Sequence, residues 1–371
     1  MTWRRVLVTV MVVAVVAAGC GDGNSATTTT SGVAGATATT TSGIASVEPT
    51  TSPETPRPSR EEIRFQSGGF ELVGDLHLPG GEGLFGGVIL VPGSGGQTRD
   101  SAPSAGLIRE RFLDAGYAVL SWDKPGSGES RGQLSEEYEL TELATILTDG
   151  ILLLAEHPAV DPDRIGLWGL SQAGWVMPMA LTMTDQVSFM IVVSGGGEDS
   201  IEQMVYGWER KAACSGASEE EVAIMQEHGP AALKATSYEE HRAAMERLLT
   251  IPDLDRYVGL DVALAEPEDW SPWPRDIDAF FDPMTVIEQT TIPVLAIFGG
   301  LDVQVDPIQG AEAYQAALDQ AGNPEFRVEL IPDVGHTLKP ASAHGCVSGS
   351  GGYSPRYLEL IDEWIERLQG T

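Results

Sequence analysis

The sequence predicts an α/β fold in which a mostly parallel, eight-stranded sheet is covered by helices on both faces and carries an inserted helical cap. Short apolar runs rich in β-branched residues alternate with longer helical patterns from Glu61 onward, as in parallel sheets covered by helices. This alternation breaks once, between Ser194 and Val294, where helical patterns alone continue. Before Glu61 the chain is rich in Ser, Thr, Gly, Ala and Pro, which predicts that the fold begins there.

Eight segments have the length and composition of strands. The first two are expected to form an antiparallel hairpin around Ser67-Gly68-Gly69, because paired glycines between alternating runs mark tight turns. The predicted strands are 63–66, 71–78, 87–91, 118–122, 165–168, 189–194, 294–298 and 327–331. Helices that cover the sheet are predicted over 105–115, 139–156, 171–183, 308–321 and 355–368.

The long interval between the sixth and seventh strands contains helical patterns over 202–214, 219–228 and 238–249, followed by a Trp/Pro-rich stretch over 270–274. A structureless connection of that length is rare in a compact domain. We therefore expect a helical cap at about 199–290 that covers the functional site. Its aromatic residues either line an apolar pocket or form the cap's own small core; they are Trp208, Tyr257, Trp270, Trp273, Phe280 and Phe281.

The first residues have the pattern of an export signal. Arg4 and Arg5 precede a 13-residue apolar run over 6–18, which is shorter than the ~20 residues that a bilayer-spanning helix needs. The segment 17–20 also resembles the lipobox of bacterial lipoproteins, with Ala17 where leucine is usual. We expect residues 1–19 to be a signal peptide and Cys20 to be lipidated, which would make the protein an outward-facing membrane lipoprotein; ordinary secretion is the alternative.

Residues 20–60 are predicted to be a disordered Thr/Ser/Pro-rich tether, and residues 61–371 the folded domain. The first 60 residues hold four basic and three acidic side chains, a net of +1, so residues 61–371 carry a formal charge of −33 within the net −32 of the whole chain. Such a charge repels phosphate backbones and anionic lipids, which argues against a nucleic-acid partner and against membrane contact other than through Cys20.

A short motif combines a strand, a small-residue turn and the start of a helix. In Gly169-x-Ser171-x-Ala173-Gly174 the serine falls at the sharp turn, where small neighbours let the backbone close tightly, as in a nucleophile elbow. In this position the motif resembles that of the alpha/beta-hydrolase superfamily, in its esterase and serine-aminopeptidase-like branch, over essentially all of residues 61–371. Ala173 stands where the family usually has glycine. The resemblance implies that Ser171 is a nucleophile.

A serine hydroxyl needs a base and an acid that orients the base. Of six histidines, His336 follows the last strand in a Gly-His loop like the family's catalytic loop, with His344 as the fallback. Asp302 follows the seventh strand in a loop that resembles the family's acid loop, and it keeps the chain order serine, acid, histidine.

Two other aspartates are alternatives for the role of the acid. Asp306 and Asp199 are the rivals of Asp302, although Asp306 is expected near the start of a helix, where an acidic side chain is favoured anyway. Asp123 matches a structural turn of the family.

Two backbone N–H groups are expected to hold an oxyanion. One belongs to Gln172, at the start of the helix after Ser171, where the helix dipole favours negative charge. The other belongs to Ser94, in a Gly-rich loop that resembles the family's His-Gly-x-Gly loop with Pro92 in place of histidine. A simple Gly-rich turn is the alternative.

With Cys20 acylated, Cys214 and Cys346 remain, and in an exported protein they are expected to form a disulfide, with two free thiols as the alternative.

The resemblance implies a serine hydrolase that acts on an acyl ester, first of all a carboxylesterase. The expected substrate is a small-molecule ester or a short peptide. A serine exopeptidase or a thioesterase is the second reading, and a substrate-binding lipoprotein with an inactive hydrolase fold is the non-enzyme alternative. No metal or organic cofactor is expected, and the sequence leaves the oligomeric state open.

Overall fold

The computed structural model of the protein describes residues 58–259, 262–342, 345–347 and 351–370. The predicted signal peptide, Cys20, nearly all of the predicted tether and His344 lie outside these residues. Within the described residues, none of the helices combines the length and the apolar character needed to cross a bilayer.

The strands are β1 (Ser59–Ser67), β2 (Phe70–Leu78), β3 (Phe85–Val91), β4 (Tyr117–Trp122), β5 (Val160–Leu170), β6 (Phe189–Val193), β7 (Val294–Gly299) and β8 (Phe326–Ile331). The helices that flank the sheet are α2 (Ala105–Asp114), α3 (Glu139–Ala155), α4 (Ala173–Leu181), α10 (Pro307–Gln320) and α11 (Pro355–Gly370). Between β6 and β7 lie α5 (Ser200–Cys214), α6 (Glu219–Leu233), α7 (Tyr238–Leu248), α8 (Leu254–Val258), the 3₁₀ helix η1 (Asp278–Phe280) and α9 (Met284–Ile287).

The eight strands form one sheet in the order β1-β2-β4-β3-β5-β6-β7-β8. All neighbours from β4 to β8 are parallel, whereas β2 is antiparallel to both β1 and β4. The first hairpin closes with Ser67 opposite Phe70, and Gly68 and Gly69 take the positive φ values that the tight turn requires. The predicted fold class is confirmed.

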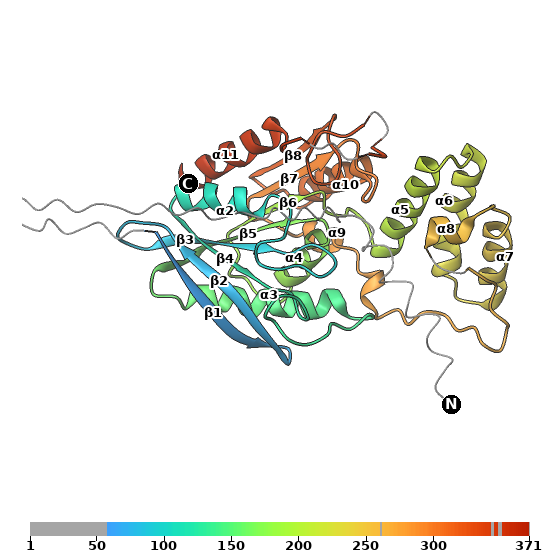
Figure 1. The fold of residues 1–371 in the computed structure, drawn as a ribbon, viewed down its shortest axis with the longest axis horizontal. Helices are drawn as coiled ribbons and strands as arrows, with labels where there is room; N and C mark the ends of the chain where they lie inside the picture. The colour runs from blue at the N-terminus through green and yellow to red at the C-terminus, as the bar shows by residue number, and fades with distance from the viewer. Residues whose placement is uncertain (1–57, 260–261, 343–344, 348–350, 371) are drawn as a thin grey trace, which may run out of the picture.

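Both faces of the sheet are covered by helices. Successive residues of its central strands point to opposite sides, so neighbouring residues pack against different helices. One face, with Ile89, Leu167 and Val192, packs against α3, α4 and α10. The other face, with Val88 and Trp168, packs against α2 and α11, which Figure 1 shows on the side of the sheet opposite α3. The strands therefore read as continuous apolar runs, since a side chain on either face is buried.

The helices α5 to α8 form a unit that we call the cap, residues 200–258. Figure 1 shows it at one end of the molecule, beyond the strands. Ser218 and Ser237 start α6 and α7 with capping boxes, in which Glu221 and Glu240 bond back to the cap residue. The cap has its own apolar core, which includes Met204, Val205, Trp208, Ala212, Met225, Met245, Leu248 and Tyr257.

Candidate active site

Ser171 lies at the sharp turn between β5 and α4. Its φ of +60° is in the left-handed region, which residues other than glycine adopt rarely and at a cost in free energy. The surrounding backbone holds the turn, since the Ser171 N–H donates to the Val193 carbonyl (2.9 Å) and the Ser171 carbonyl accepts from the Gly174 N–H (2.7 Å). This strained strand-to-helix turn has the geometry of a nucleophile elbow.

Small residues around Ser171 leave room for this turn. A Cβ on Gly169 would lie 2.3 Å from the Cβ of Ala173, and a Cβ on Gly174 would lie 2.5 Å from the Cα of Gly195. Real atoms do not approach so closely, so both glycines are required sterically. Ala173 fits in place of the family's usual glycine because its methyl group faces Gly169, which has no side chain.

Asp302 and His336 come together from the loops after β7 and β8. His336 Nδ1 lies 2.7 Å from Asp302 Oδ2, and the Asp302 side chain is only 1% exposed. The other carboxylate oxygen, Oδ1, accepts the N–H groups of Gln304 (2.7 Å) and Val305 (3.1 Å). Because a carboxylate only accepts, Nδ1 must carry the proton of this bond, which leaves Nε2 of a neutral imidazole as an acceptor.

Within the described residues, no hydrogen bond joins the Ser171 hydroxyl to His336. The structure therefore brings Asp302 and His336 together, while Ser171 takes no part in their hydrogen bond. Bonds of this kind are often long or poorly aligned in ligand-free structures and tighten only when substrate binds.

The rival carboxylates have other partners. Asp306 Oδ1 accepts the Ile308 and Gln309 N–H groups at the start of α10, where the sequence placed it. Asp199 caps α5 in the same way and also pairs with Lys234 (2.7 Å). Both carboxylates thus stabilise helix N-termini.

Asp123 is buried in the turn after β4. It accepts the backbone N–H groups of Arg99 (2.9 Å) and Glu129 (2.8 Å) and pairs with the Arg99 guanidinium. These bonds lower the pKa of the Asp123 carboxyl against the opposing effect of burial, which is the larger single influence. The residue has the structural role expected for it.

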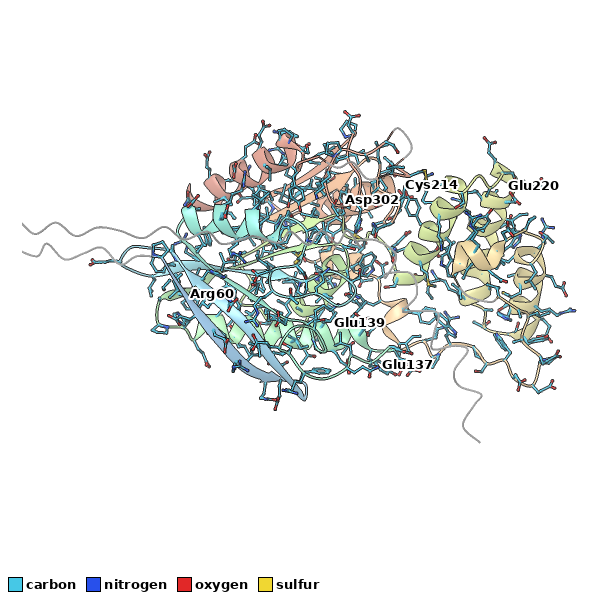
Figure 2. All side chains as sticks on the ribbon, in the orientation of Figure 1. Arg60, Glu137, Glu139, Cys214, Glu220 and Asp302 are labelled. Carbon is cyan, nitrogen blue, oxygen red and sulfur yellow. A yellow bond between two sulfur atoms is a disulfide. The ribbon has the colours of Figure 1, made fainter. Side chains whose placement is uncertain are left out.

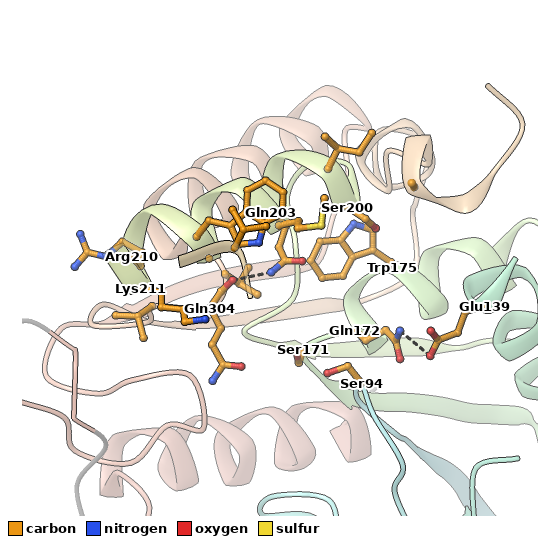
Figure 3. A pocket seen from close by; sticks show the side chains of 18 of the residues that line it. Ser94, Glu139, Ser171, Gln172, Trp175, Ser200, Gln203, Arg210, Lys211 and Gln304 are labelled. Carbon is orange, nitrogen blue, oxygen red and sulfur yellow. Dashed lines mark hydrogen bonds between the residues drawn. The ribbon is translucent and has the colours of Figure 1, made fainter. Parts of the chain in front are cut away.

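The two predicted oxyanion donors lie beside Ser171. Ser94 and Gln172 line the same pocket as Ser171, and Figure 3 shows the three residues close together. A Cβ built on Gly93 would lie 3.7 Å from the Ser171 Cβ, so the Gly-rich loop is packed directly against the turn at Ser171. In the described part of the chain, neither the Ser94 N–H nor the Gln172 N–H donates a hydrogen bond.

A cavity of about 510 Å³ lies between the sheet and the cap, with Ser171 in its wall. Much of its surface is apolar, and residues from α4, α5, α8 and the segment before η1 contribute to it; among them are Trp175, Ile201, Met204, Trp208, Tyr257, Val258, Trp273, Pro274 and Ile277. The aromatic residues predicted for the cap do not separate into pocket and core residues. Trp208 and Tyr257 belong to the cap core and also line the cavity, whereas Trp270 stacks on His241.

A disulfide joins Cys214 to Cys346, with a Cα–Cα distance of 5.4 Å. It links the C-terminal end of α5, where Figure 2 marks Cys214, to the segment that follows His336. Both cysteines also line the cavity. The bond thus ties the cap to the segment that follows His336.

Sequence reasoning missed the residues that attach α5 to the acid loop. The Tyr206 hydroxyl donates to the Asp302 carbonyl (2.8 Å), and Gln203 Nε2 donates to the Gln304 carbonyl (2.7 Å), a bond drawn in Figure 3. No local pattern marks these two side chains, because their partners lie about a hundred residues away in the sequence.

Also missed was an ion pair between the buried Lys124 and Glu139, which is partly exposed and lines the cavity; the pair lies behind the loop that carries Ser94. The Lys124 side chain is 2% exposed, and its ammonium lies 3.3 Å from Glu139 Oε1. Burial lowers the pKa of Lys124, against the opposing influence of Glu139. A lysine beside a Gly-rich turn was the only sequence signal.

Two glutamates near α5 have raised pKa values. Burial, reinforced by the negative charges of Glu202 and Asp306, raises the pKa of Glu198 to about 8. Burial and the charge of Asp306 likewise raise the pKa of Glu209 to about 7. Among residues 58–259, 262–342, 345–347 and 351–370, no group of three or more His, Cys, Asp or Glu side chains could hold a metal ion.

Comparison with known proteins agrees with this architecture. The model of the Alpha/beta hydrolase family matches residues 88–344. Polyketide transferase claH of Penicillium crustosum is 34% identical over 82 residues, which are 22% of this chain and 27% of that protein. Thiohydrolase aneE of Aspergillus aculeatus is 30% identical over 133 residues, 36% of this chain and 40% of that protein. The chain thus spans less than half the length of these curated relatives.

Two solved structures share the fold. The alpha/beta hydrolase GrgF from Penicillium sp. sh18 superposes with a TM-score of 0.51 at 18% identity, over 84% of this chain and 100% of that chain. The Pyrococcus furiosus esterase Pf2001 gives a TM-score of 0.51 at 16% identity, over 84% of this chain and 89% of that one. The sheet, the serine turn and the paired histidine and aspartate define an α/β protein of the hydrolase type. The chain belongs to the alpha/beta hydrolase family.

Proposed function

We propose that this protein is a serine hydrolase that cleaves an acyl ester, a carboxylesterase, through Ser171, His336 and Asp302. The observation that carries the proposal is the buried bond between His336 Nδ1 and Asp302 Oδ2 (2.7 Å). That bond leaves Nε2 of His336 as the acceptor that a serine nucleophile needs. The strained turn at Ser171 and the two uncommitted N–H groups beside it supply the remaining parts.

In the proposed reaction, the Ser171 Oγ attacks the acyl carbonyl carbon and its proton passes to His336 Nε2. The carbonyl π electrons move to oxygen, and the Ser94 and Gln172 N–H groups hold the resulting oxyanion. The oxyanion collapses, the bond to the alcohol oxygen breaks, and His336 gives its proton to the leaving alcohol. Water then attacks the acyl-enzyme by the same steps, which releases the carboxylic acid and restores Ser171.

An ester with an apolar acyl group is the substrate class that the cavity favours. Its Trp, Met and Ile walls between α4 and α5 offer apolar contact to such a group, and its volume of about 510 Å³ is in the range of small-molecule sites. A thioester is the second candidate, favoured by the similarity to a protein named as a thiohydrolase. The serine exopeptidase considered from sequence uses the same triad, so the pocket alone distinguishes the three.

The test is a panel of p-nitrophenyl esters, acyl thioesters and aminoacyl anilides, with the wild type and Ser171→Ala. We expect ester turnover by the wild type and a loss of at least about 10⁴-fold in Ser171→Ala, because the nucleophile is absent. Ser59→Ala, at an exposed serine of β1, is the matched control and should keep full activity. A fluorophosphonate probe should label Ser171 in the wild type. Folded wild type that gains no adduct would instead favour a binding lipoprotein with an inactive fold.

We further propose that the protein is exported and held at the membrane by a lipid on Cys20, with residues 20–60 as the tether. The support is the sequence pattern of residues 1–20. Cys20→Ala should abolish incorporation of labelled palmitate and release the protein into the medium. Retention of the variant at the membrane, without label, would contradict the anchor.

A further inference from the structure

Lys124 is a buried cation whose position calls for a physical explanation. Its ammonium donates to the carbonyl of Gly93 (3.0 Å), to Gln172 Oε1 (3.1 Å) and to Glu139 Oε1 (3.3 Å). A lysine is rarely so buried, because the ammonium loses its hydration, and it is tolerated only where acceptors replace the water. Here the three acceptors come from three separate segments, of which two carry the proposed oxyanion donors.

The bond to Gly93 orients the first donor. The Gly93 carbonyl and the Ser94 N–H belong to one planar, trans peptide unit, so they point in opposite directions. When Lys124 holds the carbonyl, the N–H of Ser94 is directed away from the ammonium. A positive charge on the carbonyl also polarises the peptide unit and strengthens its N–H as a donor. Gln97 braces the loop further. Its side-chain Oε1 accepts the Gly93 N–H (3.0 Å), and its backbone carbonyl accepts the backbone N–H of Lys124 (2.9 Å).

The bonds to Gln172 restrain the second donor. Gln172 Oε1 accepts from Lys124, and Gln172 Nε2 donates to Glu139 Oε1 (3.1 Å), as drawn in Figure 3. Both ends of this amide are therefore fixed. The backbone N–H of the same residue follows Ser171 directly at the start of α4, so restraint of the side chain also restrains the turn that presents this N–H.

We propose that Lys124 and Glu139 are positioning residues. They hold the Ser94 and Gln172 N–H groups in the relative orientation in which both can donate to one oxyanion. This inference rests on the proposed function and deepens it. Neither side chain needs to touch the substrate's reacting atoms, because they act through the peptide unit of Gly93 and the amide of Gln172. Glu139 also balances the positive charge that Lys124 brings into the interior, which explains why the two side chains form an ion pair.

The central test is Lys124→Met, which keeps most of the side-chain volume and removes the ammonium. We expect kcat to fall about 10- to 100-fold with KM nearly unchanged, since full loss of one oxyanion donor costs about 10²- to 10³-fold. A trifluoromethyl ketone, whose adduct with Ser171 carries an oxyanion, should lose affinity by the factor by which kcat/KM falls. A purely structural role would lower the melting temperature without this parallel loss.

A second variant keeps the inference testable if Lys124→Met does not fold. Glu139→Gln retains an oxygen that accepts from Lys124 and Gln172 but removes the charge, so we expect a smaller, roughly 3- to 10-fold loss of kcat and of ketone affinity. The matched control is Lys234→Met, which removes a cap lysine that pairs with Asp199 and Glu202 and should leave ketone affinity unchanged.

Unchanged ketone affinity in folded Lys124→Met or in Glu139→Gln would overturn the inference. Ester turnover by the wild type would still support the proposed function in that case. A wild type with neither turnover nor a Ser171 adduct would overturn both.

Discussion

At the scale of single residues, the two carboxylate oxygens of Asp302 have different partners. Its Oδ1 holds the backbone of the acid loop, and its Oδ2 holds His336. Sequence reasoning found this residue because it follows a recognisable strand. That reasoning also placed Asp306, four residues later, near the start of a helix, and the structure confirms that this carboxylate caps α10.

Asp302→Asn tests the role of the charge at this position. The amide oxygen can still accept the Gln304 and Val305 N–H groups, so the loop should remain folded. The NH₂ group would then face His336 Nδ1 and favour the tautomer in which Nε2 carries the proton. We expect kcat to fall about 10⁴-fold, as in other triads, with a nearly unchanged melting temperature. A loss of less than about tenfold would contradict the assignment of Asp302 as the acid.

Glu198 provides a prediction of pH dependence. Its pKa is about 8 in the folded protein and 4.5 as an ordinary glutamate, so the folded state binds the proton more tightly. The stability that this group contributes is complete below about pH 4.5 and is lost as the pH rises to about 8. Glu198→Gln should therefore melt at a higher temperature than the wild type at pH 8, with the difference closing toward pH 4.5.

Melting curves from pH 4.5 to 8.5 measure this difference. Glu110→Gln, at an exposed glutamate of α2, is the control and should follow the wild type at every pH. The same difference in melting temperature between Glu198→Gln and the wild type at all pH values would point to packing and not to proton binding.

At the scale of elements, α5 is the cap helix that contacts the loops carrying Asp302 and His336. Tyr206 and Gln203 bond to the acid loop, and Cys214 is bonded to the segment after His336. Helical periodicity indicated that α5 exists, because that signal is local. Which of its side chains would meet the loops after β7 could not be predicted, because such contacts depend on how the cap packs.

The disulfide should contribute strongly to stability, since it closes a sequence separation of 132 residues. Cys214→Ser together with Cys346→Ser should lower the free energy of unfolding by about 2–5 kcal/mol, measured by urea denaturation. Dithiothreitol should shift the melting temperature of the wild type down toward that of the double variant, since both cysteines are exposed. A wild type unaffected by reductant, with both thiols alkylated, would show that the bond contributes nothing.

At the scale of the whole molecule, the dominant electrostatic property is the formal net charge of −32. Like charges on a compact domain repel one another, and salt screens that repulsion. We therefore expect the melting temperature at pH 7 to rise as NaCl increases from about 0.02 to 0.5 M. The same titration near pH 4.3, the sequence isoelectric point, should give a much smaller rise. A fall in melting temperature with salt at pH 7 would mean that surface ion pairs outweigh the repulsion.

The sequence by itself determined the class of fold, the turn at Ser171 and the loops that carry Asp302 and His336. Local patterns predict these features: apolar runs, helical periodicity, and small residues where a strand must turn sharply into a helix. The tertiary structure alone decided what the loops meet. The contacts of Lys124 with Gly93, the attachment of α5 to the acid loop and the shape of the cavity all join segments distant in the chain. Such contacts depend on packing, for which a single sequence has no local signal.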